Sequence, residues 1–187
     1  MLLVAGWTTG ALIEGPRYDP VTQTISVLAA GGRTGYWVVT GMLVSVGTCY
    51  LLTALGLRAA APAGRLCLGG GGVAAILLAM FPAPRSGGSL PHGSVVGVGF
   101  SLLAVWPVLA SRRSGRPPWG LRPVPSIVVT TLMWVGAVWF LIEVQNHGDA
   151  GIAERVVTSA VSLWPFVVVA SCLRHSGRMG GRGQPST

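Results

Sequence analysis

The sequence is poor in charge and contains no lysine: its thirteen basic residues are all arginines, set against only five acidic residues. Charged residues make up 10% of the chain, hydrophobic residues make up 51%, and the mean hydropathy is +0.63. A soluble domain carries about 25% charged residues, because its surface must bind water. The composition therefore excludes a soluble globular protein and predicts a chain whose solvent is lipid.

Cysteine is also scarce, and the common signatures of metal and phosphate chemistry are missing. Cys49, Cys67 and Cys172 lie in apolar stretches without a C-x-x-C pair, so we interpret them as packing residues. The chain has no H-E-x-x-H, G-x-S-x-G, phosphate-loop or D-D-x-x-D motif. We expect neither a metal nor another cofactor.

The formal charge of +8 does not indicate a nucleic-acid partner. Arginines of a nucleic-acid-binding domain gather on one face among polar neighbours, whereas here they separate long apolar runs. We predict no nucleic-acid partner and interpret the charge as a signal of membrane topology.

Apolar runs that approach the length of a membrane span occur at six places. A spanning helix needs about 20 residues, because it rises about 1.5 Å per residue across about 30 Å of hydrocarbon. The first run is short, but we count it as a span. The runs are residues 1–14, 36–57, 66–82, 93–111, 124–144 and 152–173. The predicted fold is all-α, a polytopic membrane bundle of about six transmembrane helices.

Arginine placement predicts how the bundle is oriented, since short cytoplasmic loops retain positive charge. With the N-terminus inside, nine arginines fall in cytoplasmic segments and four fall on the opposite side. This favours a multi-pass protein of the cell membrane with both termini in the cytoplasm. The chain divides into a single bundle, residues 1–174, and a glycine-rich cytoplasmic tail, residues 175–187, which we expect to be disordered because it buries little apolar surface.

In this topology every acidic residue falls on the extracytoplasmic face, and His92 and His147 join them there. Ionisable groups near hydrocarbon are costly and are usually paired or functional. We therefore predict the site at this face, where the acids are Glu14, Asp19, Glu143, Asp149 and Glu154.

The connection EGPRYDPVTQTIS, residues 14–26, is the most polar segment beside a span. Its two prolines break the helix, and a segment this polar could not face lipid. We interpret it as a re-entrant or capping loop that lines a cavity. The alternative is a water-facing loop in which Ser26 or Thr24 caps a short interfacial helix.

Two further segments bring ionisable groups to the start of a helix. His92 precedes the G-x-x-x-G pair of Gly93 and Gly97, which favours close approach of another helix, as does the glycine run at 69–72. A histidine side chain can both donate and accept a proton, so His92 serves either in proton transfer or as an interfacial group bonded to a backbone carbonyl. In GIAERV, Glu154 and Arg155 occupy a first helical turn, where a carboxylate is favoured by the helix dipole.

Three segments in this order carry a family resemblance: YDPVTQTIS, the FP dipeptide before the loop that ends at His92, and GIAERV. They resemble the bacterial domain-of-unknown-function family 998, six-span proteins common in actinobacteria. The similarity runs from about residue 15 to residue 173. The chain departs from that family's pattern at Val27 and at Ala83-Pro84, where the family usually carries polar residues. The resemblance implies the fold and no activity.

In size and architecture the chain is also similar to small integral-membrane terpene cyclases of meroterpenoid pathways. Those enzymes protonate an epoxide or alkene with a carboxylic acid and guide the cation in an apolar, aromatic cavity. This second resemblance implies metal-free acid-base chemistry on an apolar substrate. Its most concrete form is cyclisation of a prenylated molecule, an isomerase or lyase reaction of secondary metabolism.

The sequence thus predicts Glu14, Asp19 or Glu154 as the proton donor, with His92 as a relay. The alternative is a non-catalytic membrane protein that binds a lipid or a partner subunit, in which Arg155 closes the bundle by pairing with Asp19 or Glu14. Conduction is not expected, because no polar stripe through mid-span is visible. The predicted substrate-binding residues are Tyr18, Thr24, Ser26, Glu143 and Arg155.

Overall fold

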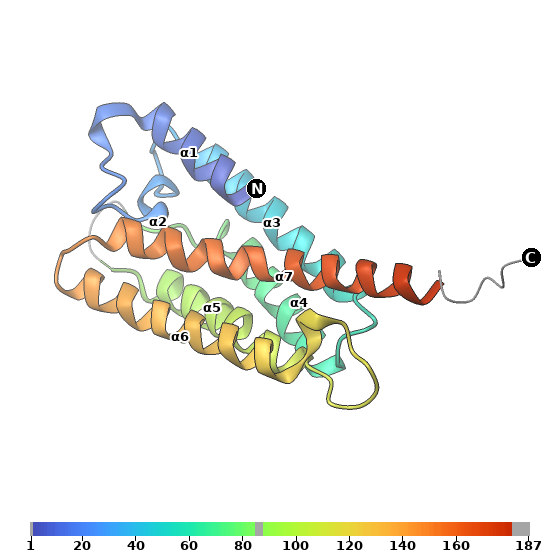
Figure 1. The fold of residues 1–187 in the computed structure, drawn as a ribbon. Helices are drawn as coiled ribbons and strands as arrows, with labels where there is room; N and C mark the ends of the chain where they lie inside the picture. Colours follow the sequence, from blue (N-terminus) through green and yellow to red (C-terminus); the bar gives the residue numbers. More distant parts are fainter. Residues whose placement is uncertain (1, 85–87, 181–187) are drawn as a thin grey trace, which may run out of the picture.

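The computed structural model describes residues 2–84 and 88–180, and within them the chain is helical with no strand. Six longer helices form a bundle (Figure 1), which confirms the predicted all-α polytopic fold. Three short elements lie in its connections, η1 (Gly15–Arg17), α2 (Ile25–Leu28) and η2 (Trp119–Leu121). The longer helices are α1 (Leu2–Glu14), α3 (Tyr36–Gly56), α4 (Pro62–Leu77), α5 (Leu90–Ala110), α6 (Pro123–Gln145) and α7 (Ala150–Gly180).

Four of these helices, α3, α5, α6 and α7, are long and apolar enough to cross a membrane, and α4 is a shorter apolar helix. The chain is therefore a multi-pass membrane protein, and its exposed apolar faces suit contact with lipid. With 13 residues, α1 is about 20 Å long, less than the hydrocarbon thickness. Helix α4 ends earlier than the apolar run predicts, since the ring of Pro82 would clash with the carbonyl of Leu78 in a continuing helix.

Glycine allows helices α3 and α4 to approach closely. A Cβ on Gly47 would meet the carbonyl oxygen of Gly72 at 2.5 Å, and one on Gly72 would meet the carbonyl oxygen of Gly47 at 2.7 Å. The run at 69–72 is therefore a helix-packing face, as the sequence indicates. In the described part of the chain, added Cβ atoms on Gly93 and Gly97 would meet nothing within 4 Å, so no described helix of this chain packs closely against that pair.

The bundle has two chemically different ends. One end gathers the α1–α3, α4–α5 and α6–α7 connections, on the left of Figure 1, and the other carries the α3–α4 and α5–α6 connections and the end of α7. All five acids belong to the first end, as predicted, and we name it the acidic end. Which end faces the cytoplasm remains a prediction. Helix α7 continues past residue 174 to Gly180, and the rest of the predicted tail, residues 181–187, lies outside the described residues.

Candidate functional site

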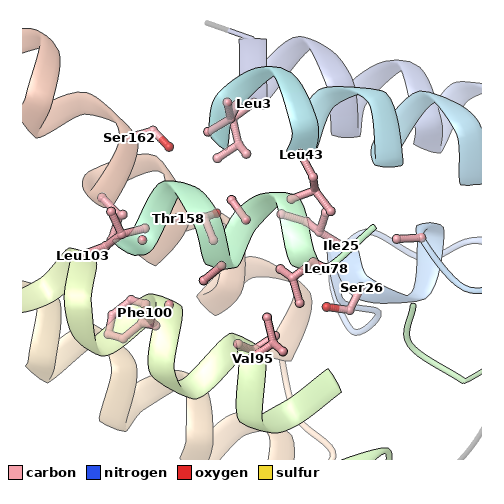
Figure 2. Close-up of a pocket in the computed structure, with 18 of the residues that line it drawn as sticks. Leu3, Ile25, Ser26, Leu43, Leu78, Val95, Phe100, Leu103, Thr158 and Ser162 are labelled. Atoms are coloured by element: carbon pink, nitrogen blue, oxygen red, sulfur yellow. The ribbon is translucent and has the colours of Figure 1, made fainter. Parts of the chain in front are cut away.

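A cavity of about 150 Å³ lies toward the acidic end, between α7 and the layer formed by α3, α4 and α5. Helix α7 packs mainly against α6, which leaves its opposite face to the cavity. Most of the wall is aliphatic; in Figure 2 Leu78 and Val95 lie on the side of Ser26, and Phe100 lies on the side of Leu103. The polar residues of the wall are Ser26, Tyr50, His92, Glu154, Thr158 and Ser162.

Helix α7 supplies three of these polar groups at four-residue spacing. Because residues four apart lie on one helix face, Glu154, Thr158 and Ser162 form a column along the cavity. The Ser162 hydroxyl lies 3.0 Å from the Tyr50 hydroxyl, while Thr158 donates to the backbone carbonyl of Glu154 at 2.6 Å. The sequence analysis missed this column, and its expectation of no polar stripe is wrong for α7; the i, i+4, i+8 spacing was the available signal.

The centre of the site is a hydrogen-bonded chain from Glu154 through Ser26 to His92. Ser26 Oγ lies 3.4 Å from Glu154 Oε1 and 3.3 Å from His92 Nε2. Glu154 Oε2 accepts from the backbone N–H of Ile25, so α7 provides the cap that Thr24 does not give to α2. The side chains of Glu154, Ser26 and His92 are all half-buried, and all three line the cavity.

The hydrogen-bonded groups Glu154, Ser26 and His92 can hold their protons in two arrangements. His92 Nδ1 lies 2.8 Å from the carbonyl oxygen of Phe81, which only accepts, so Nδ1 carries hydrogen. If the imidazole is neutral, Ser26 donates to Nε2 and a protonated Glu154 donates to Ser26 Oγ. If Glu154 is ionised, Ser26 donates to it and an imidazolium donates to Ser26. One proton therefore moves between carboxyl and imidazole with every hydrogen bond kept.

The position of Glu154 depends on how the first turn of α7 sits on the α1–α3 connection. The N–H of Ile152 donates to the carbonyl of Val21 at 3.1 Å. Gly151 is buried against this segment, and a Cβ there would meet the carbonyl oxygens of Pro20 and Val21 at 2.5 and 2.8 Å, with that of Gln23 closer still. Backbone contacts thus hold α7 in register with α2.

Arg155 secures the same junction and does not line the cavity. Its guanidinium donates to the carbonyl of Pro20 at 2.8 Å and to the Tyr18 hydroxyl at 2.5 Å, and lies 5.7 Å from the ring centroid of Tyr18. Burial raises the pKa of the Tyr18 phenol, although Arg155 opposes that shift, so the phenol stays neutral and donates to the carbonyls of Gln23 and Thr24. The partners of Arg155 are therefore backbone oxygens and a phenol, where the non-catalytic alternative expected Asp19 or Glu14.

Glu14 is buried outside the cavity and paired with Arg33. Its Oε1 accepts from Arg33 Nη1 at 2.9 Å, and its Oε2 accepts from the N–H of Thr34 at 3.0 Å. The Glu14 side chain is 4% exposed, so the pair is held mainly in protein surroundings. These bonds tie the end of α1 to the start of α3.

We expect Glu14→Gln to destabilise the protein by about 1–2 kcal/mol, since the amide cannot accept the charged hydrogen bond from Arg33 as the carboxylate does. Denaturant unfolding in detergent, followed by tryptophan fluorescence, measures the change. Asp149→Asn is the matched control, because the Asp149 side chain is exposed and makes no hydrogen bond or ion pair with the described part of the chain. An equal loss in both variants would contradict the structural role of Glu14.

The remaining predicted residues organise the loops of the acidic end. Asp19 is exposed, and the Thr22 hydroxyl and Val21 N–H lower the pKa of its carboxyl group, which keeps it ionised. Glu143 accepts from Trp139 Nε1 at 3.0 Å and from the Asp149 N–H at 2.8 Å, and so fixes the turn into α7. Neither carboxyl group lines the cavity.

Across residues 2–84 and 88–180, no group of three or more histidine, cysteine, aspartate or glutamate side chains is placed to hold a metal ion. Comparison with known families matches residues 1–171 to a family of proteins of unknown function, described as DUF998.

The chain belongs to the DUF998 family. The match spans more than nine-tenths of the sequence and includes every residue that lines the cavity, from Leu3 to Ser162. No curated protein and no solved structure matches the chain. The DUF998 description carries no activity, so the chemistry of this member is argued from its geometry.

Proposed function

We propose that this protein is a membrane enzyme that performs acid-base chemistry on the end of an apolar chain, most concretely the cyclisation of a prenylated molecule. The observation that carries the proposal is a carboxyl group, Glu154, which lines an apolar cavity and is joined through Ser26 to a histidine. A carboxylic acid in this position can give up a proton, and the relay can replace it from His92.

The reaction balances without an added reagent. Glu154 transfers its proton to an alkene carbon or an epoxide oxygen of the substrate, which leaves a carbocation. A second double bond of the substrate attacks the cation and closes a ring, and a neighbouring carbon then loses a proton to water. The neutral His92 takes up a proton from water, and this proton passes through Ser26 to the Glu154 carboxylate, which restores the starting state. Substrate and product are isomers, and no electron is gained or lost.

The size of the cavity restricts what reacts there. A volume of about 150 Å³ is that of a protein cavity that holds a benzene-sized molecule, so it takes about one isoprene unit. A complete prenylated aromatic molecule does not fit. The proposal is therefore that the terminal apolar unit enters between α7 and α3–α5, with Phe100 and Tyr50 supplying aromatic walls toward a developing cation.

Glu154 is the best supported of the three predicted donors. Glu14 has both oxygens bonded away from the cavity, and Asp19 is exposed with a lowered pKa. Of the predicted binding residues, Ser26 lines the cavity, whereas Tyr18, Arg155 and Glu143 hold the segments around it. Their contribution is positioning.

The test is an isomer search in heavy water. Membranes containing the protein are incubated in D₂O with prenylated and epoxidised prenylated compounds. The products are separated by chromatography, and their masses are measured by mass spectrometry. Because Glu154 exchanges its proton with solvent, the expected product from an alkene has a new retention time and is heavier by one deuterium. Membranes without the protein give the background.

The same experiment separates catalysis from the alternative of lipid or ligand binding. Copurification of a compound with the folded protein, without any new isomer, supports the non-catalytic alternative and overturns the proposal. From an alkene substrate, a new isomer that carries no deuterium also overturns the proposed proton transfer to carbon.

A further inference from the structure

The end of the bundle opposite the cavity, the basic end, carries positive charge without any acidic partner. Three of its arginines bind backbone carbonyls: Arg65 donates to that of Ala54 at 2.7 Å, Arg112 to that of Ala59 at 2.8 Å, and Arg122 to that of Pro117 at 3.4 Å. In the described part of the chain, no hydrogen bond or ion pair is found for the side chains of the exposed arginines 113, 116 and 174. The arginines of this end whose side chains the structure describes are Arg58, Arg65, Arg112, Arg113, Arg116, Arg122 and Arg174.

Two adjoining hollows concentrate this charge. The first, of about 460 Å³, lies between η2 and α7, and the second, of about 730 Å³, extends along the α5–α6 connection. They share Trp119, Arg122 and His175. Arg174 adds a cation to the first hollow and Arg116 to the second, so both face the same shared wall.

The wall of the first hollow is fixed by packing. The N–H of Gly120 donates to Ser171 Oγ at 3.0 Å, and the rings of Trp119 and Trp164 meet edge to face at 5.8 Å. Gly120 lies against Val168, where an added Cβ would come within 3.0 Å of the Cα atom. These contacts hold η2 against α7 and position Arg122 beside the end of α7.

The hollow is also amphipathic along α7. Phe166 is 70% exposed and lies eight residues before Arg174, which places it about 12 Å deeper along the helix. Trp119 is 52% exposed at the level of the arginines, where indole rings prefer the membrane interface. Positive charge therefore lies at one end of the hollow and apolar surface at the other. A phospholipid is complementary to this pattern, because it has a negatively charged phosphate at one end and apolar acyl chains at the other.

We propose that the hollow between η2 and α7 binds an anionic phospholipid, with the headgroup phosphate at Arg122 and Arg174 and an acyl chain along Phe166. A phosphate supplies the negative charge that the basic end lacks, and guanidinium groups bind it through paired N–H donors. The site lies at the other end of the bundle from Glu154. It does not depend on the proposed cyclisation, and its failure would leave that proposal untouched.

The test compares lipid retention by native mass spectrometry of the detergent-purified protein. We expect phosphatidylglycerol to bind more tightly than phosphatidylcholine, and Arg122→Gln with Arg174→Gln to weaken phosphatidylglycerol binding about 30-fold, since each interfacial arginine contributes about fivefold. The matched control is Arg17→Gln with Arg58→Gln, which removes the same charge outside the hollow. The control is expected to bind within about threefold of the parent protein.

Each other outcome overturns the proposal. Equal affinity for the two lipids, or equal losses in both double variants, shows attraction by overall charge without a site. Displacement of the lipid by inorganic phosphate at equal concentration shows an anion site that makes no use of the acyl chain. If the double variant does not fold, Arg174→Gln alone, at an exposed side chain, is expected to lose about fivefold, and an unchanged affinity contradicts the assignment.

Discussion

Replacement of Glu154 by glutamine is expected to lower isomer formation by about 10²–10⁴-fold while the bundle stays folded. The amide cannot transfer a proton to the substrate, but its oxygen can still accept the N–H of Ile25, so the cap on α2 persists. Turnover is measured by chromatography with mass detection, and folding by thermal unfolding in the same detergent.

Two companion variants separate proton donation from packing in this experiment. Ser26→Ala keeps the carboxyl group and removes the hydroxyl that joins it to His92, so activity should fall less than in Glu154→Gln. Thr158→Val keeps the shape of a wall residue whose hydroxyl is already bonded to the carbonyl of Glu154. Full activity in Glu154→Gln, or an equal loss in Thr158→Val, would sink the assignment of the donor.

Gly151→Ala should cost about 3 kcal/mol of stability and most of the activity, since the new methyl group meets three backbone carbonyls that cannot rotate away. Alanine favours helix over glycine by about 1 kcal/mol, so helix propensity alone predicts the opposite sign. Moving the first turn of α7 from the 20–23 segment also separates Glu154 from Ile25 and Ser26.

The control for this variant is Gly93→Ala, at a helical glycine near the same end where an added Cβ meets nothing within 4 Å. It should be neutral or slightly stabilising. Unfolding midpoints and isomer yields are compared for both variants. A Gly151→Ala protein as stable and active as Gly93→Ala would show that the close contact of α7 with the loop is not needed.

The five acidic residues show that the order of charges in the sequence predicts where a side chain lies in the bundle but not which partner it binds. Their common location follows from alternation of apolar runs and connections, and the structure places all five at one end. Their partners do not follow, because Glu14 meets Arg33 and Glu143 meets Trp139 through distances set by loop geometry. Position along a span predicts depth in the membrane, whereas pairing depends on the rotation of each helix.

The polar column of α7 could have been predicted from the sequence, but the sequence analysis did not identify it. Thr158 and Ser162 look mild beside Glu154, but their four-residue spacing puts all three on one helix face. Tyr50 was not predictable, since its contact with Ser162 joins helices more than a hundred residues apart. The glycine pair at 93 and 97 has the motif, but no described helix of this chain packs closely against it.

The sequence by itself determined that this protein is embedded in lipid, that it is helical, and that it belongs to the DUF998 family. It also determined that the acidic residues lie at one end of the bundle and most arginines at the other. These depend on composition and on the order of apolar runs, which the bilayer constrains directly. Tertiary structure alone decided that Glu154, Ser26 and His92 form one chain beside a cavity, whereas Glu14 does not. Glu154 lies beside Ser26 because backbone contacts between the first turn of α7 and the α1–α3 connection fix the position of α7 along its axis and its rotation about that axis. No pattern of residues in the sequence indicates these contacts.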